Sequence, residues 1–294
     1  MYWILTLTIA TFWGGSFIAI KEVVQIIDPR LGVFLRILIA LVSIRVMQFV
    51  LKKEVRIKRQ DILIVSLAGL FSLAFPFMFL FWGETRISAG LSGIINSTVP
   101  FWTFILAVNF LAEEKFTSAK ASGIFFGIIG IVFIFYPQIS FKSDGFEMLG
   151  MLAVLGMAIC YAIGNVLTRV VLRRKGASFH GNLFYQHLAS AIVMALVCLI
   201  FCSKPVASDI LNTKVVVSIL YLGIFSTALA LFIFYYLIGK FGAVKASVVI
   251  YIVPIMALFW DYVFFRNIPE ISQIIGMCII FGGVLLTQKK SKNN

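Results

Sequence analysis

Residues 88–111 read SAGLSGIINSTVPFWTFILAVNFL, a stretch of 24 residues without a charged side chain. At about 1.5 Å per residue, a helix of this length crosses the roughly 30 Å hydrocarbon core of a bilayer. Its apolar residues are continuous rather than alternating, and a segment in lipid must satisfy its own backbone hydrogen bonds. The stretch therefore predicts a transmembrane helix and not a barrel strand.

Comparable apolar runs fill most of the 294 residues, of which 61% are hydrophobic and 13% charged. A soluble domain is only about 45–50% apolar. The mean hydropathy of +1.04 likewise indicates a membrane protein. We therefore expect an all-α membrane protein with ten transmembrane helices in the lipid bilayer. The expected helices cover residues 3–20, 31–51, 62–83, 88–111, 118–137, 147–171, 182–202, 214–238, 243–265 and 270–287.

The charge balance indicates a topology. The 25 Lys and Arg residues outnumber the 12 Asp and Glu residues, but they lie in short loops beside apolar runs, so we expect no nucleic-acid partner. With the N-terminus inside, 16 cations fall in cytoplasmic segments and seven in outer ones. This bias predicts that both termini are cytoplasmic. Residues 3–20 lack a basic n-region and a cleavage site, so they are interpreted as a retained first span.

An internal repeat appears when the sequence is shifted by 154 residues. The shift superposes Gly69 on Gly223, Phe71 on Phe225, Ser72 on Ser226, Ala74 on Ala228, Ala89 on Ala243, Val99 on Val253, Pro100 on Pro254, Phe110 on Phe264 and Ser118 on Ser272. We expect two five-helix repeats, residues 1–143 and 144–294. Because five is odd, the second repeat must enter the membrane with inverted polarity, an arrangement typical of secondary transporters with a central site.

Polar side chains within the apolar runs should face that site, because exposure to lipid is costly. The clearest stripe is on 88–111, where Pro100 is expected to kink the helix. Further candidates lie on 3–20, 62–83, 147–171 and 243–265. The predicted solute-binding residues are Trp13, Ser16, Phe75, Phe79, Ser92, Asn96, Thr103, Tyr161, Asn165, Ser247 and Tyr251.

Charged residues within the runs have several interpretations. We expect Arg36 and Arg45 to extend toward the two interfaces from the ends of their helix, and Glu84 with Arg86 to form a solvated boundary pair. For Asp261 two interpretations stay open, a structural pair with Arg266 and a role in proton coupling.

Metal, redox and catalytic chemistry have little support in the sequence. The two histidines and four cysteines are scattered and form no CxxC pair, so no metal or cofactor is expected. No HExxH, DDxxD or paired carboxylates occur in the runs, which leaves a membrane-embedded lipid-modifying enzyme as a distant alternative. The glycines of 118–137 and 270–287 indicate either helix packing or a homodimer contact.

The sequence resembles the EamA-type carriers of the drug/metabolite transporter superfamily. The resemblance rests on the segment Trp13 to Phe17, on Phe34, Leu35 and Arg36, and on the two proline-containing runs around Pro100 and Pro254, which are followed by Gly123 and by Gly276 with Gly283. It implies a multi-pass carrier of the bacterial inner membrane whose cavity is formed by the first, third, fourth, sixth, eighth and ninth helices.

The resulting hypothesis is alternating-access export of small metabolites, in particular amino acids, by a protein that is not an enzyme. Asn96, Tyr161, Asn165, Ser247 and Tyr251 would supply hydrogen bonds. Trp13, Phe75 and Phe79 would bound the apolar part of the solute. The alternative is multidrug export of lipophilic cations, which would require a membrane carboxylate.

Overall fold

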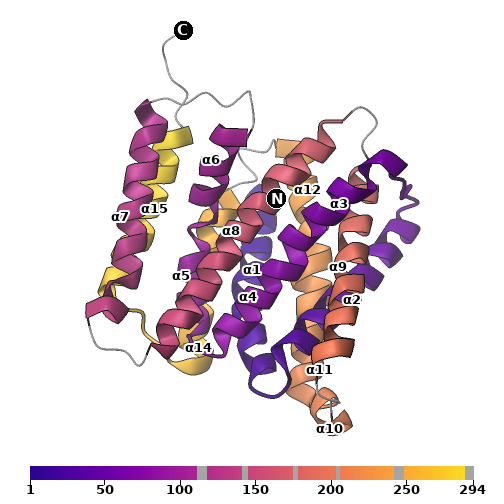
Figure 1. Ribbon diagram of the computed structural model, residues 1–294, viewed down its shortest axis with the longest axis horizontal. Coiled ribbons are helices and arrows are strands. Elements are labelled where there is room, and N and C mark those ends of the chain that lie inside the picture. The colour runs from indigo at the N-terminus through magenta and orange to yellow at the C-terminus, as the bar shows by residue number, and fades with distance from the viewer. Residues whose placement is uncertain (111–117, 141–144, 175–177, 203–205, 242–247, 289–294) are drawn as a thin grey trace.

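Helices form all the regular structure in the described part of the chain, and no strand occurs there (Figure 1). The computed structural model describes residues 1–110, 118–140, 145–174, 178–202, 206–241 and 248–288. The elements are α1 (Tyr2–Val24), α2 (Pro29–Val50), η1 (Arg59–Asp61), α3 (Ile62–Gly69), η2 (Leu70–Ala74), α4 (Phe75–Glu84), α5 (Ala89–Asn96), α6 (Val99–Phe110), α7 (Ser118–Ser140), α8 (Phe146–Leu172), α9 (Phe179–Phe201), α10 (Ala207–Ile210), α11 (Thr213–Leu220), η3 (Tyr221–Leu229), α12 (Ala230–Phe241), α14 (Val248–Phe265) and α15 (Ile271–Gln288).

Several helices begin at side chains that cap them. Asp28 accepts a hydrogen bond from the Arg30 N–H at 2.8 Å and is followed by Pro29, which suits the first turn of α2. Ser88 and Ser178 accept from the third residue beyond them, at the starts of α5 and α9. These caps satisfy N–H groups that a helix start leaves without a partner, so short loops suffice between long helices.

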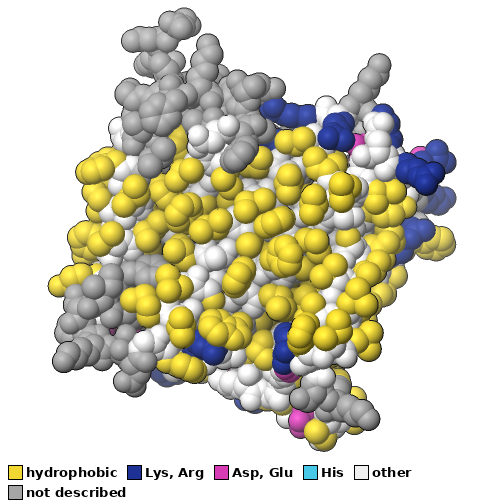
Figure 2. Space-filling model, in the orientation of Figure 1, with side chains coloured by type: hydrophobic (Ala, Val, Ile, Leu, Met, Phe, Trp, Pro, Cys, Tyr) yellow, Lys and Arg dark blue, Asp and Glu magenta, His cyan; other side chains and the backbone are white. Residues whose placement is uncertain are grey.

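The helices have the length and composition of membrane spans. Seven stretches, residues 2–24, 29–50, 59–84, 89–107, 146–172, 179–201 and 213–234, are long and apolar enough to cross a bilayer, and shorter apolar stretches cover 125–134, 252–265 and 271–283. Figure 2 shows hydrophobic side chains over most of the visible face, with Lys and Arg mainly toward its edges. The prediction of a helical membrane protein is confirmed by this pattern.

Two helices stand apart from the rest of the bundle. Figure 1 shows α7 and α15 side by side at its left edge, and they pack chiefly on each other. A Cβ added at Gly130 would lie 2.6 Å from the Gly276 carbonyl oxygen, so only glycine permits this approach. The predicted glycine faces thus serve packing within the chain, while the homodimer alternative stays a prediction.

The backbone departs from regular α-helix in two kinds of place. The expected helix 88–111 is divided into α5 and α6 at Ser97 and Thr98, whose N–H groups bond the carbonyls three residues back at 3.0 Å. Pro100 follows and cannot donate to the Asn96 carbonyl. In addition, η2 and η3 are π-helical segments that join α3 to α4 and α11 to α12. Such wide turns change which side chains a helix presents to its neighbours.

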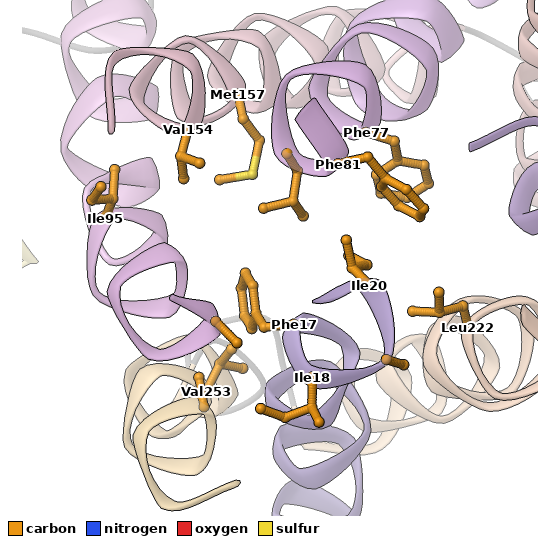
Figure 3. Packing of buried hydrophobic residues seen from close by; sticks show 14 of the residues in the cluster. Phe17, Ile18, Ile20, Phe77, Phe81, Ile95, Val154, Met157, Leu222 and Val253 are labelled. Carbon is orange, nitrogen blue, oxygen red and sulfur yellow. The ribbon is translucent and has the colours of Figure 1, made fainter. Parts of the chain in front are cut away.

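The apolar core lies between the remaining helices. In Figure 3, Phe17 and Ile20 from α1 converge with Phe77 from α4 and Met157 from α8. These residues belong to one continuous buried cluster. In this arrangement α1 packs on α14, α12 and η3, while α8 packs on α3, α4 and α6.

Candidate functional site

A cavity of about 320 Å³ lies inside this bundle. Its lining comes from α1, α2, η2, α4, α5, α6, α8, α9, η3, α12 and α14. Aromatic walls are supplied by Trp13, Phe17, Phe77, Tyr161 and Phe234. The volume falls in the range of roughly 300–1,000 Å³ that small-molecule sites occupy, and an apolar lining with few polar groups is typical of them.

Five predicted site residues line this cavity. Trp13 and Ser16 come from α1, where the indole Nε1 donates to the Ser226 carbonyl at 3.0 Å and fixes the ring against η3. Asn96, Tyr161 and Asn165 come from α5 and α8. Helices far apart in the sequence therefore bring these side chains to one space.

Other predicted residues lie elsewhere. Ser92 is fully buried beside Glu84 and does not line the cavity. Thr103 lies behind the wall and accepts a hydrogen bond from Asn165 Nδ2 at 3.3 Å. Phe75 and Phe79 are 38% and 42% exposed and point away from the cavity, so the apolar wall there is formed by Phe77 instead.

Phe77 lies on a different face of α4 from Phe75 and Phe79. Leu73, Phe77 and Leu80 follow one another at intervals of four and three, the spacing of one helical face, and all three line the cavity. The rotation of α4 against its neighbours therefore turns this face inward, and the sequence spacing alone does not choose between the two faces. Of the remaining candidates, Ser247 lies outside the described residues, and for Tyr251 only the backbone in α14 is described.

Arg36 corrects an expectation. It does not extend to an interface: it lines the cavity, and only 5% of it is exposed. Arg45, further along α2, is exposed as expected. The reason is the rotation of α2, which turns residue 36 toward η3 and α4 and turns residue 45 outward.

The sequence analysis also missed the contribution of α9. Asn182, Gln186 and His187 line the cavity, and Gln186 Nε2 donates to Thr168 Oγ1 at 3.0 Å. A signal was available, because Asn182, Gln186 and Ser190 follow one another at intervals of four within an apolar run. In a helix this spacing gives a polar stripe on one face.

Several polar atoms at the cavity lack partners. Buried lining atoms without a hydrogen bond in the described part of the chain are Arg36 Nη1, Asn182 Oδ1, His187 Nε2 and Ser226 Oγ. Buried polar groups in proteins are nearly always paired, and exceptions often mark a place that a ligand or water completes. The cavity thus combines apolar walls with several free hydrogen-bonding groups.

Charged side chains pack together at one end of the bundle, beyond the lining residues Phe17 and Leu80, and we call this region the closed end. Lys21 Nζ donates to the carbonyls of Glu84 and Ile87 at 2.6 and 2.8 Å, at the C-terminal end of α4. A cation there also complements the helix dipole. Glu84 is fully buried and Asp261 is 2% exposed, and both act electrostatically on Lys21.

This closed end overturns two expectations. Glu84 is not a solvated partner of Arg86, whose guanidinium stacks instead on the Trp82 ring with its Cζ 3.5 Å from the centroid. Asp261 does not pair with Arg266: it accepts from Asn267 Nδ2 at 3.2 Å and does not line the cavity. Arg266 turns toward Tyr262 because its backbone adopts a positive φ of 59° after α14 ends.

The opposite end is more open. A second hollow is lined by Arg56, Asp61, Val171, Ser178 and other residues near the starts of α3 and α9. Asn182 borders both hollows. The second hollow therefore adjoins the cavity at Asn182, on the side of the bundle away from Lys21.

Metal ligands do not gather in the described residues: no group of three His, Cys, Asp or Glu side chains there could hold an ion. The four cysteines are free thiols spread over α8, α9, α15 and the residue after α9. The lining carries hydrogen-bonding and apolar groups, which suit recognition of a molecule rather than its chemical conversion.

The fold and the cavity define a multi-pass membrane protein with an internal site for a small molecule. A family model described as the EamA-like transporter family matches residues 1–136 and 148–288. The chain belongs to this family, and it is therefore a membrane transporter of a small-molecule solute.

Curated relatives match along almost their whole length. A protein of Archaeoglobus fulgidus named "Uncharacterized transporter" is 28% identical over 292 residues, with 98% of this chain and 99% of that protein covered. The "Uncharacterized transporter YoaV" of Bacillus subtilis is 26% identical, with 95% and 94% covered. The "Probable terminal-alkyne amino-acid exporter" of Streptantibioticus cattleyicolor is 22% identical, with 98% and 93% covered.

A solved crystal structure also matches, with a TM-score of 0.66 and 19% sequence identity over 97% of this chain and 95% of that one. At this identity the likeness concerns the fold alone. The resemblance predicted from the sequence is confirmed by the family match.

Proposed function

We propose that this protein exports small metabolites, in particular amino acids, across the bacterial inner membrane by alternating access. The observation that carries the proposal is the cavity of about 320 Å³, whose lining combines aromatic walls with residues that carry unpartnered polar atoms. An amphipathic solute such as an amino acid matches both features. The name of the Streptantibioticus relative, an amino-acid exporter, agrees with this substrate class.

The proposed architecture is ten transmembrane helices in two inverted repeats, residues 1–143 and 144–294. The cavity lining supports it, because six pairs of lining positions are separated by the 154 residues of the sequence repeat. The pairs are Ser72 with Ser226, Leu73 with Thr227, Phe77 with Leu231, Leu80 with Phe234, Asn96 with Ile250 and Val99 with Val253. The two π-helical segments also lie at corresponding positions. Inverted repeats around a midplane site are the usual basis of alternating access.

We place both termini in the cytoplasm, from the bias of the loop cations. The loop before η1 and the start of α9 are then cytoplasmic, and the Lys21 end is external. Because a second hollow near residues 56–61 adjoins the cavity at Asn182, we propose that this conformation is inward-facing and receives the solute from the cell. Export would require the Lys21 end to open and the cytoplasmic end to close.

Within the cavity, Asn96, Tyr161 and Asn165 would hydrogen-bond the solute, and Trp13 and Phe77 would contact its apolar part. Ser247 and Tyr251 keep their predicted roles as hydrogen-bonding groups. Asp261 does not line the cavity, so its proposed coupling role would be exercised at the closed end and not by contact with the solute.

Export of lipophilic cations has less support. None of the described residues that line the cavity is Asp or Glu, whereas a buried organic cation would require an acidic partner. If an Asp261→Asn variant retained all drug efflux, the hypothesis of lipophilic-cation export through a membrane carboxylate would be excluded.

The test is efflux of labelled amino acids from cells that overexpress the protein. We expect accelerated efflux of at least one amino acid, and a loss of about tenfold or more in an Asn96→Ala, Asn165→Ala double variant, because each amide lines the cavity and offers hydrogen bonds to a solute there. Asn109→Ala is the matched control, since this amide lies on an exposed face of α6 and bonds only the Ile105 carbonyl at 2.7 Å. Unchanged efflux of all twenty amino acids, with the protein verified in the membrane, would contradict the substrate class.

A further inference from the structure

Arg36 is a buried cation that faces the cavity. Its guanidinium lies over the Phe77 ring, with Cζ 3.9 Å from the centroid, and its Nε donates to Thr227 Oγ1 at 3.3 Å. Its Nη1 is buried and has no hydrogen-bond partner in the described part of the chain. The guanidinium is thus held by the hydrogen bond of Nε and by its stacking on the Phe77 ring, while Nη1 remains without a partner.

Among the described residues, no carboxylate forms an ion pair with this guanidinium. The recorded ion pairs of the described residues are Arg30 with Asp28, Arg56 with Glu54, Arg174 with Asp61 and Lys214 with Glu22. Glu84 acts on Arg36 only through space. An unpaired cation within a membrane protein is strongly unfavourable, and such residues usually mark the path of a substrate or ion.

We propose that Arg36 is the anion-binding group of the cavity and selects solutes that carry a single carboxylate. The planar guanidinium presents paired N–H donors whose spacing matches the two oxygens of a carboxylate. Among the described residues that line the cavity, Arg36 is the only Lys or Arg. One such cation balances a monoanion, whereas a phosphate dianion would remain half compensated.

The surroundings fit the rest of such a solute. Phe77 and Thr227 fix the orientation of the guanidinium, so little freedom is lost when a carboxylate binds. Trp13 and Phe234 line the same cavity, and their rings lie with centroids 5.4 Å apart. An apolar substituent can pack on them while the carboxylate meets Arg36. This inference rests on the proposed transport function and names the chemical group by which the solute is recognised.

A purely structural role makes a different prediction. If Arg36 only joined α2 to η3 through Thr227, its replacement would weaken binding of every solute equally. Recognition of a carboxylate instead predicts that the affinity for a carboxylic acid falls more than the affinity for its carboxamide, so the ratio of the two affinities changes. The ratio therefore separates the two roles.

The experiment uses the purified full-length protein in lipid nanodiscs, with binding measured by thermal shift and by isothermal calorimetry. The probes are L-leucine, L-phenylalanine and L-threonine, the carboxamide of each, and 4-methylpentanoate, which carries a carboxylate but no ammonium. We expect at least one acid to bind about tenfold or more tightly than its amide, as for a charge-assisted hydrogen bond. Arg36→Gln should bring this ratio near one, and Arg36→Lys should leave an intermediate ratio. Arg45→Gln, an exposed arginine on the same helix, is the matched control and should keep the wild-type ratio.

The outcomes distinguish the inference from the proposed function. Equal binding of acid and amide by the wild type would overturn the role of Arg36 and leave amino-acid export standing. Binding of 4-methylpentanoate that depends on Arg36, without binding of any amino acid, would support the inference and count against amino-acid export. An equal loss of acid and amide binding in Arg36→Gln would assign Arg36 a structural role. If Arg36→Gln does not fold, the wild-type ratio and the Arg36→Lys variant decide.

Discussion

Two of the places where charged side chains are buried in the described part of the bundle differ in how the protein surrounds them. At the closed end, Lys21 donates to two backbone carbonyls and lies near the carboxylates of Glu84 and Asp261. At the cavity, Arg36 has one hydroxyl partner, an aromatic face and a free Nη1. The ammonium of Lys21 thus has protein partners, although Oε1 and Oε2 of the neighbouring Glu84 are buried without a hydrogen-bond partner in the described residues. The guanidinium of Arg36 keeps hydrogen-bonding capacity on the side of the cavity.

This difference separates a structural charge from one available to a ligand. A buried ion with partners on several sides cannot be removed without leaving those partners uncompensated, so its loss should unfold the region. A buried ion that faces a cavity can be reached by water, and it has fewer partners to lose. Replacement of Lys21 should therefore mainly lower the stability of the protein, whereas replacement of Arg36 should mainly change its solute selectivity.

The largest effect is expected for Lys21→Met. The substitution leaves two carbonyls without a donor and two buried carboxylates without a cation, and breaking such a buried arrangement costs about 3 kcal/mol or more. The melting temperature of the purified protein in nanodiscs measures it. Lys214→Met is the control, because Lys214 pairs with Glu22 at 2.9 Å but its side chain is 66% exposed, so a cost below about 1 kcal/mol is expected. Equal melting temperatures for the two variants would erase the distinction between the two sets of charges.

A smaller loss is expected where the helices meet near the closed end. A Cβ at Gly93 would contact the Ala257 Cβ at less than van der Waals separation, so Gly93→Val should force α5 from α14. Overpacking of this kind costs about 1–3 kcal/mol. Gly282→Val is the matched control, since nothing lies within 4 Å of its added Cβ. Thermal unfolding of both variants provides the measurement, and a larger loss at Gly282 would show that the packing near the closed end is loose.

Replacement of Arg36 should change stability less than replacement of Lys21. Arg36→Gln removes one hydrogen bond and one cation–π contact, but it also removes the unfavourable burial of a poorly compensated charge. We expect a net change within about 1 kcal/mol, read from the melting temperature in the absence of solute. A loss as large as that of Lys21→Met would mean that Arg36 is as tightly integrated as the closed end.

The smallest effect is expected for Phe79→Ala. Phe79 is 42% exposed and faces away from the cavity, and lipid is as favourable as protein for an apolar group. Melting temperature and the acid-to-amide binding ratio should both stay near wild type, with a stability change within about 0.5 kcal/mol. Phe77→Ala, which removes the ring beneath Arg36, should alter both. A change in solute preference in Phe79→Ala alone would place the cavity wall on the other face of α4.

Helices were predictable because lipid imposes a strict local requirement. The expected runs 31–51 and 147–171 correspond to α2, which covers Pro29–Val50, and to α8, which covers Phe146–Leu172. The exception is 88–111, where the structure breaks the helix at Ser97 and Thr98. Pro100 signals an irregularity there, but a missing N–H does not specify which residues leave the helix.

The cavity was only partly predictable. Asn96, Tyr161 and Asn165 were found because polar side chains in an apolar run must face protein or water. Phe75 and Phe79 were misplaced, because the spacing of α4 allows more than one face and only its packing turns the face of Leu73, Phe77 and Leu80 inward. Arg36 was assigned to an interface because sequence position gives depth along a helix but not its rotation against neighbours. Ser92 satisfied the same spacing rule as Asn96 but faces the closed end.

The sequence by itself determined the class of this protein, its helical character and its membership of a transporter family, because apolar length and backbone hydrogen bonding in lipid are properties of single segments. Only the tertiary structure decided which polar and charged side chains share the cavity and which are compensated at the closed end. Those relations join residues as distant as Arg36 and Thr227, or Lys21 and Glu84. They depend on the rotation and contact of whole helices, which local sequence does not encode.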